Sequence, residues 1–256
     1  SHCGESFGES DQCTSRLRST PHNSPSVMQA STDVTIPTSF PDTKWVKAAD
    51  LMPGIASMVR RAYISIEGGP VLQVWEPGDD AVDPPSGAAF KLAPGAKLPA
   101  VIIIHGGGWT GGDKRAAREI NIGTNLALHG YVGMSVNYIL STNGSVTWPQ
   151  NLHDCKTAVR WLRKHAERLQ VDPERIGVIG GSAGGHLAAM LAVTGEKDGL
   201  DPAGPYGEFS CRVRCAVDLY GPADLAGHHD VTMLGKKAAE APELYRAASP
   251  VTYVDN

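Results

Sequence analysis

Four short aliphatic segments recur along the chain and alternate with segments of helical spacing. They read PAVIIIH, YVGMSVNY, RIGVIG and VRCAVDLY, at residues 99–105, 131–138, 175–180 and 213–220. Near-continuous apolar runs of this length are typical of strands buried on both faces of a parallel sheet. Their alternation with helices predicts an α/β fold, in which a mostly parallel, doubly wound sheet carries helices on both faces.

Three helices are predicted between these strands. The first covers residues 114–129 and ends before Gly130, the second starts near Pro149, and the third covers residues 183–194. In the second helix one face is apolar, and the opposite face is charged. The apolar residues are Leu152, Cys155, Val159, Leu162, Ala166 and Leu169, and the charged ones are Lys156, Arg160, Arg163, Lys164 and Glu167.

The N-terminal part of the chain differs in composition from the rest. Residues 1–44 contain nine Ser, six Thr and four Pro, so we expect a disordered or loosely packed arm, followed by one domain over residues 45–256. An antiparallel hairpin is predicted from residues 62–67 and 71–76, which flank a Gly-Gly-Pro turn. Residues 77–98 are rich in Pro, Gly and Asp and read as a surface loop.

Charge and composition exclude several classes of partner. The 23 basic and 27 acidic residues give a net charge of −4, which does not favour a nucleic-acid partner. No run of 18 apolar residues occurs, so no membrane span is predicted. Five cysteines match no zinc or redox spacing: Cys3, Cys13, Cys155, Cys211 and Cys215. We expect no metal and no cofactor, and we expect Cys155 and Cys215 to be buried packing residues.

Two glycine clusters follow two of the predicted strands. The first is HGGGW at residues 105–109, and the second is GGSAGG at residues 180–185. Ligands of open α/β sheets bind beyond the carboxyl ends of the strands, which is where both clusters fall. Neither cluster contains the G-x-x-x-x-G-K-[ST] pattern of a phosphate-binding loop. The pairing of the two clusters favours a catalytic site over two unrelated loops.

The second cluster matches the pattern G-x-S-x-G around Ser182. A serine presented on a sharp strand-to-helix turn needs small residues two positions before and after it, and Gly180 and Gly184 occupy those positions. The amide of Ala183 at the start of the helix can then bind the negatively charged oxygen of a tetrahedral intermediate.

The first cluster supplies the rest of the expected oxyanion hole. Gly107 and Gly108 have no side chains that could block their backbone N–H groups, and we expect the loop to bring both groups toward the oxyanion. His105 is expected to fix this loop by hydrogen bonding. Trp109, Tyr138 and Tyr220 lie at or near strand ends and are candidate wall residues for the substrate site, although each could equally belong to the core.

Together these segments resemble a known family. HGGGW, VNYIL, WPQNLHDCKTAVRWL, DPERIGVIGGSAGGHLAAMLA, DLYGPADL and ASPVTYV are similar to α/β-hydrolase fold esterases of the hormone-sensitive-lipase-like type. The similarity is greatest to the BD-FAE-like branch of acetylxylan and feruloyl esterases, because Gly181 replaces the Asp that precedes the serine in lipase-like members. The resemblance implies a carboxylic ester hydrolase with Ser182 as nucleophile and Gly107, Gly108 and Ala183 as the oxyanion hole.

A serine nucleophile needs a histidine base and a carboxylate, which follow it in the order Ser, Asp or Glu, His. The histidines after Ser182 are His186, expected to be a packing residue, and His228 and His229, both weak candidates for the base. Asp218 and Asp224 are weak candidates for the acid. In the resembling family the base follows a later strand, so we expect the triad Asp and His, and the last sheet strands, to lie beyond residue 256. The rival expectation is a shortened protein that has lost catalysis.

The resemblance implies removal of acetyl or feruloyl groups from a polysaccharide or a small ester through an acyl-serine intermediate. The alternatives are a general short-chain carboxylesterase, an arylformamidase-like amidase, and a non-catalytic hydrolase-like binding protein. Polysaccharide substrates and the Ser/Thr/Pro-rich arm favour a secreted or periplasmic location. The sequence does not indicate an oligomeric state.

Overall fold

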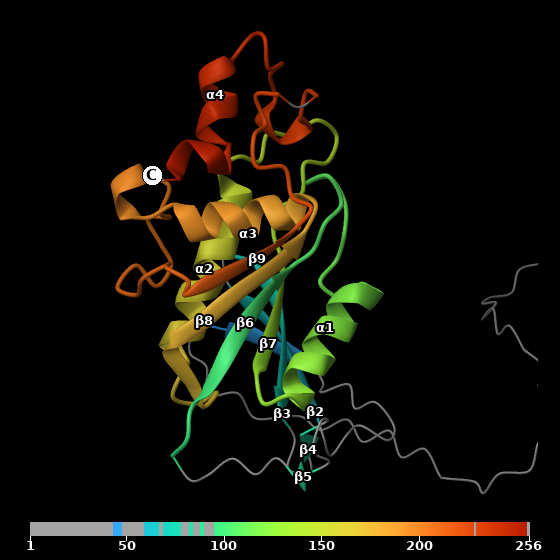
Figure 1. Cartoon of the computed structure of the whole chain (residues 1–256), viewed down its shortest axis with the longest axis vertical. Helices are drawn as coiled ribbons and strands as arrows, with labels where there is room; N and C mark the ends of the chain where they lie inside the picture. The colour runs from blue at the N-terminus through green and yellow to red at the C-terminus, as the bar shows by residue number, and fades with distance from the viewer. Residues whose placement is uncertain are drawn as a thin grey trace, which may run out of the picture. The chain divides into compact units, whose positions relative to one another are not determined.

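A seven-stranded sheet organises the described part of the chain (Figure 1). The structure is a computed structural model, and it describes residues 43–47, 59–66, 69–77, 82–83, 88–89, 95–227 and 229–254. The strand order is β1-β2-β3-β7-β6-β8-β9. The strands are β1 (Thr43–Lys47), β2 (Val59–Ile66), β3 (Val71–Pro77), β6 (Leu98–Ile104), β7 (Val132–Asn137), β8 (Val171–Gly181) and β9 (Cys215–Leu219).

The sheet has an antiparallel and a parallel part. From β1 through β2 and β3 to β7, each strand pairs antiparallel with its neighbour in the sheet. From β7 through β6 and β8 to β9, each strand pairs parallel with its neighbour. This confirms the predicted N-terminal hairpin and the predicted parallel strands. The predicted loop of residues 77–98 contains the short ladder of β4 (Val82–Asp83) and β5 (Ala88–Ala89), and much of the rest of it lies outside the described residues. The predicted arm of residues 1–44 lies almost wholly outside them too, so that boundary stays a prediction.

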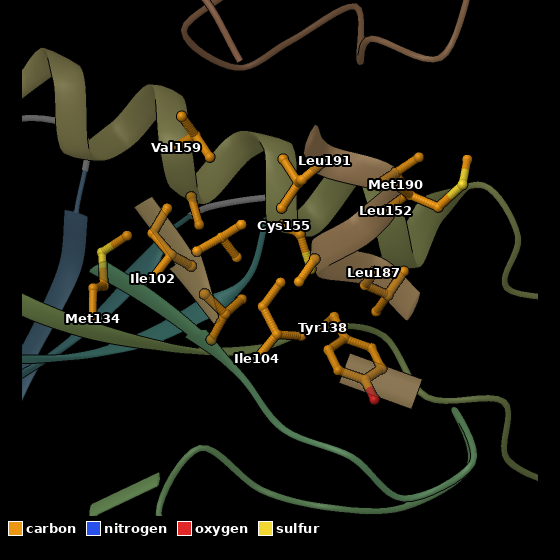
Figure 2. Packing of buried hydrophobic residues seen from close by; sticks show 14 of the residues in the cluster. Ile102, Ile104, Met134, Tyr138, Leu152, Cys155, Val159, Leu187, Met190 and Leu191 are labelled. Carbon is orange, nitrogen blue, oxygen red and sulfur yellow. The ribbon is translucent and has the colours of Figure 1, made fainter. Parts of the chain in front are cut away.

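Strand β6 lies in the middle of the parallel part and is buried on both faces. Ile102 and Ile104 point to one face, where they pack under α2 (Gln150–Lys164) and α3 (Ala183–Val193), as Figure 2 shows. Ile103 points to the other face and packs with Trp75 under α1 (Ala117–Leu128). The aliphatic run therefore has the two-sided burial that its sequence predicts, and it places the following residues at the carboxyl edge of the sheet.

Helix α1 begins at Ala117 rather than at residue 114. The preceding residues form a turn instead, because Asn137 at the end of β7 holds them from the side. Its Oδ1 accepts a hydrogen bond from the Lys114 amide at 2.6 Å, and its Nδ2 donates to the Asp113 carboxylate at 3.0 Å. At its other end the helix closes as predicted, with Gly130 at φ 79°.

The charged face of α2 is largely covered. The side chain of Lys156 is fully buried and its Nζ lies 2.5 Å from Oδ1 of Asp201, while Arg160 donates to the carbonyl of Pro202 at 2.7 Å. Arg163 donates to two further backbone carbonyls in the same loop. The basic residues of α2 therefore fasten the segment between α3 and β9, a use that helical periodicity cannot reveal.

Strand β9 lies at the edge of the described sheet, so its side chains are more exposed than those of β6. Cys215 is exposed, which corrects the expectation that it is buried, whereas Cys155 is buried as predicted. After β9 the chain forms α4 (Pro242–Ala247) and short 3-10 turns, η2 (Thr232–Leu234) and η3 (Pro250–Tyr253), with η1 (Glu196–Asp198) preceding the strand. Among the described residues, no helix is long and apolar enough to cross a membrane.

The ion pair between Lys156 and Asp201 gives a test of the covered face of α2. Asp201→Ala should lower the free energy of unfolding by about 3 kcal/mol in urea titration, because it leaves a buried ammonium without its carboxylate. Asp172→Ala, which removes the partner of the exposed Arg175, serves as the control and should change stability little. Equal effects of the two substitutions would contradict the assignment of Lys156 as buried and paired.

Candidate active site

The turn between β8 and α3 holds Ser182 in a strained backbone conformation. Ser182 has φ 56° and ψ −121°, which a residue with a side chain rarely adopts. Its amide donates to the carbonyl of Leu219 in β9 at 2.9 Å, and its own carbonyl accepts the amide of His186 at 2.9 Å. The predicted sharp strand-to-helix turn at Ser182 is therefore present in the structure.

Two glycines permit the close packing of this turn. A Cβ atom added at Gly180 would lie 2.1 Å from the carbonyl oxygen of Gly184, and one added at Gly184 would lie 2.1 Å from the carbonyl oxygen of Ile104. Both obstacles are backbone atoms, which cannot rotate away. The strand, the turn and the end of β6 therefore meet at distances that exclude any side chain at these two positions, as the sequence pattern predicts.

The loop after β6 also has an unusual backbone. Gly107, Gly108 and Trp109 have φ values of 121°, 60° and 59° in succession. A Cβ atom added at Gly106 would lie 3.4 Å from the Cβ of Ser182, so this loop runs directly beside the serine. A three-residue stretch of positive φ turns the chain sharply just after the point where Gly106 passes the serine.

His105 fixes the base of this loop, as predicted. Its Nδ1 lies 2.8 Å from the carbonyl oxygen of Gly106, and its ring stacks on Tyr138 with the ring centroids 4.4 Å apart. The Tyr138 hydroxyl donates to the His105 carbonyl at 3.1 Å. Burial lowers the pKa of His105, so the ring is neutral near pH 7.

The three amides predicted as oxyanion donors belong to the two glycine clusters, and Gly108 lines the same pocket as Ser182. Among the described residues, no backbone carbonyl accepts a hydrogen bond from the amide of Gly107, Gly108 or Ala183. The Ala183 amide belongs to the first turn of α3, whose N–H groups have no partner within the helix. These are the three donors that the sequence predicts for an oxyanion hole.

A pocket of about 460 Å³ opens beside Ser182. Of the predicted wall residues, Trp109 and Tyr220 line it, whereas Tyr138 is a buried core residue whose hydroxyl is taken up by the loop carbonyl. His229 and Asp224, which sequence reasoning treats as weak candidates, also line the pocket. The full lining consists of Gly108, Trp109, Ser182, Tyr220, Gly221, Pro222, Asp224 and His229.

The remaining candidates for the triad lie elsewhere or are not described. Asp218, a weak candidate for the acid, accepts the amide of Gly221 at 2.7 Å and so stabilises the turn after β9. His228 lies outside the described residues. Among the described residues, no group of three His, Cys, Asp or Glu side chains is arranged to hold a metal ion.

Sequence reasoning missed a cation that packs against the nucleophile turn. Nη1 of Arg118 donates to the Tyr220 hydroxyl at 3.2 Å, and the same guanidinium pairs with the buried carboxylate of Glu119. A Cβ atom added at Gly181 would lie 2.1 Å from this Nη1. The glycine before the serine therefore makes room for Arg118, and its smallness was the only signal of this contact in the sequence.

His186 is buried in the first turn of α3 and makes two side-chain hydrogen bonds. Nε1 of Trp109 donates to its Nδ1 at 3.3 Å, and its Nε2 lies 2.7 Å from the carbonyl oxygen of Ala248. Its side chain is fully buried, and this burial lowers its pKa to about 4. The histidine is therefore part of the packing beneath the pocket, as expected.

Comparison with known proteins identifies similar chains. A family model described as BD-FAE matches residues 91–256. Esterase LipQ of Mycobacterium tuberculosis is 32% identical over 173 residues, which cover 64% of this chain and 40% of LipQ. Esterase LipC of the same organism is 29% identical over 175 residues, which cover 64% of this chain and 42% of LipC. The chain thus spans less than half the length of these two relatives.

Solved structures of esterases share the fold. A structure titled as a truncated form of carbohydrate esterase from gut microbiota has a TM-score of 0.60 and 27% identity, covering 72% of this chain and 67% of the other. Thermogutta terrifontis esterase 2, phosphonylated by cyclosarin, has a TM-score of 0.56 and 26% identity, covering 72% and 61%. The chain therefore has an α/β-hydrolase fold.

Alanine substitutions at neighbouring glycines test the packing of the turn. Gly180→Ala should unfold or strongly destabilise the protein, because the added methyl group would meet backbone atoms at 2.1 Å. Gly181→Ala is the matched control and should be tolerated, because the end of the Arg118 side chain can move away. Thermal unfolding would measure both, and a Gly180→Ala protein as stable as Gly181→Ala would contradict the packing described.

The pKa of His186 predicts a pH dependence of stability. In the unfolded chain the imidazole has its ordinary pKa of 6.5, whereas in the folded protein the pKa is about 4, so the unfolded state binds more protons as the pH falls. The free energy of unfolding should therefore fall between pH 6.5 and 4, by up to about 3 kcal/mol from this residue.

Urea titrations at pH 7 and pH 4.5 would measure this effect. Buried His105 and the carboxylates also contribute to the pH dependence of stability. The informative quantity is therefore the loss of unfolding free energy between pH 7 and pH 4.5 in the wild type compared with that in His186→Gln. We expect a smaller loss of stability on acidification in the variant. An identical pH dependence in both proteins would contradict a buried, neutral His186.

Proposed function

The chain belongs to the BD-FAE family, and from this premise we propose that it is a serine carboxylic ester hydrolase acting through an acyl-Ser182 intermediate. The observation that carries the proposal is the meeting of the strained Ser182 turn with the loop of Gly107 and Gly108 at one pocket. This arrangement provides a nucleophile and several backbone donors for a developing oxyanion at the same place.

The proposed reaction has two steps. In the first, the Ser182 oxygen attacks the ester carbonyl while a base takes its proton, and the amides of Ala183, Gly107 and Gly108 stabilise the negatively charged oxygen. The tetrahedral intermediate then collapses, the bond to the alcohol breaks, and the alcohol leaves with the proton. In the second step water attacks the acyl group by the same route, which releases the acid and restores Ser182.

The substrate we propose carries an acetyl or feruloyl group on a polysaccharide or a small alcohol. Two aromatic side chains line the pocket: Trp109, which is largely buried, and Tyr220, which is exposed and offers a flat apolar surface to an acyl group or a sugar ring. The similarity to a structure titled as a carbohydrate esterase supports the sugar ester. A general short-chain carboxylesterase is the second candidate, favoured by the small volume of the pocket.

The nucleophile can be tested by turnover. We expect the full-length protein to hydrolyse p-nitrophenyl acetate and the Ser182→Ala variant to lose at least about 10³-fold in kcat/KM, because no acyl-enzyme can form. Labelling by a fluorophosphonate should disappear in the same variant. Ser182-independent turnover, or no turnover and no labelling in the wild type, would contradict the proposal and favour a non-catalytic binding protein.

His229 can be tested as a base on the same assay. It lines the pocket with Ser182, but the base of this fold follows a later strand, so we expect His229→Ala to keep Ser182-dependent labelling and to lose at most about tenfold in kcat. A loss as large as that of Ser182→Ala would instead assign His229 as the base.

Comparison of acetylated xylan, methyl ferulate and p-nitrophenyl acetate then distinguishes the polysaccharide ester from a general short ester.

A further inference from the structure

A chain of hydrogen bonds beside the pocket connects Trp109 to the segment after α4 through one histidine. On one wall Trp109 follows the predicted oxyanion donors Gly107 and Gly108 directly. Its indole nitrogen donates to Nδ1 of His186 at 3.3 Å, and the two rings meet edge to face with centroids 5.2 Å apart. The exposed fraction of Trp109 is 4% and that of His186 is 0%, so water does not compete for this bond.

The other nitrogen of the histidine contacts the backbone of the segment after α4. Nε2 lies 2.7 Å from the carbonyl oxygen of Ala248, in the segment after α4. The next residue, Ser249, accepts the amide of Leu225 on its hydroxyl oxygen at 2.8 Å. Leu225 follows Asp224, which lines the pocket. His186 therefore lies between the loop of Gly107 and Gly108 and the segment of Ala248 and Ser249, which bonds the residue after Asp224.

The partners of His186 determine which nitrogen carries its proton. An indole N–H can only donate, so Nδ1 must be an unprotonated acceptor. The proton then lies on Nε2, where it is donated to the carbonyl of Ala248. A histidine in this state can accept from Trp109 and donate to Ala248 at the same time, whereas the other tautomer would reverse both ends and fit neither partner.

The loop that depends on this contact is unfavourable by itself. Trp109 has φ 59°, a conformation that costs of order 1–3 kcal/mol for a residue with a side chain, and it follows two glycines that restrict the backbone little. The backbone of Trp109 is held at one point, where its carbonyl accepts the amide of Ser141 at 2.8 Å. The amides of Thr110 and Gly111 also donate to the Gly107 carbonyl at 3.1 and 3.0 Å, and the Trp109 indole adds a side-chain anchor at His186.

We propose that His186 is a positioning residue for the oxyanion hole: by accepting the Trp109 indole N–H, it holds the Gly107–Gly108 amides in place beside Ser182. This inference rests on the proposed function of Ser182. It assigns to His186 a part in catalysis without contact to the substrate. A loop free to move would present its donors wrongly to the oxyanion, and loss of one such donor typically costs about 10²–10³ in kcat.

Substitutions at position 186 separate this role from packing alone. His186→Leu removes the acceptor, and we expect kcat per titratable Ser182 to fall about 10- to 100-fold with little change in KM. His186→Asn places an amide oxygen near the position of Nδ1, so it should restore most of the lost kcat. Active sites are counted by the end point of fluorophosphonate labelling, so a variant that merely misfolds in part would show fewer sites but an unchanged rate per site.

A double-mutant cycle identifies the partner. Trp109→Phe keeps an aromatic ring but removes the donor, so it should lower kcat about as much as His186→Leu, and the double variant should lose no more than either single one. His129→Asn is the matched control, because His129 is exposed at the end of α1 and its ring bonds a backbone carbonyl, and it should leave kcat unchanged. If His186→Leu does not fold, it is replaced by His186→Gln, whose side chain is long enough to reach the carbonyl of Ala248.

A measurement on Trp109 tests the hydrogen bond without any assay of activity. In protein labelled with ¹⁵N-tryptophan, the Trp109 indole N–H should be protected from hydrogen exchange in the wild type and in His186→Asn, and should lose that protection in His186→Leu. If the protein shows no esterase activity but the Trp109 indole shows this pattern of protection, the proposed function is rejected and the hydrogen bond between Trp109 and His186 is retained. An unchanged kcat per site in His186→Leu, multiplicative losses in the double variant, or unaltered protection of Trp109 would overturn the role of His186.

Discussion

A contact between backbone atoms of β6 and α3 fixes the rest of the site. Because Gly184 has no side chain, the first turn of α3 lies against the carbonyl of Ile104, and Gly180 approaches Gly184 equally closely on the other side of the turn. These contacts hold the backbone of Ser182 in its strained conformation, with φ 56° and ψ −121°. The strain of the turn is held by the surrounding elements, which are themselves secured by a core that is buried on both faces of β6.

The same contact places the oxyanion loop. The end of β6 leads directly into His105 and the glycines that follow, so the packing that fixes Ser182 also fixes the start of the loop beside it. The neutral ring of His105, stacked on Tyr138, secures the base of the loop, and Trp109 secures its far end. The nucleophile and its donors therefore share one rigid support, which is the condition for stabilising charge that develops only in the transition state.

Features encoded by neighbouring residues were predictable from the sequence. The aliphatic runs of β6, β7 and β8 indicate buried strands, and the glycines two positions before and after Ser182 indicate the turn, because each feature depends on a few consecutive residues. Contacts between distant segments were not predictable. The start of α1 depends on Asn137, the burial of Lys156 depends on Asp201, and the contact of Trp109 with His186 joins residues 77 positions apart.

In the proposed reaction Ser182 carries the acyl group during turnover. The most direct measurement is to mix the full-length protein with an activated acetyl ester, quench with acid within one turnover, and map the modified peptide by mass spectrometry. We expect an acetyl group on Ser182 that forms before the free acid is released and disappears as turnover ends. An acetyl group on another residue with the same time course, or hydrolysis with no modified peptide, would contradict it.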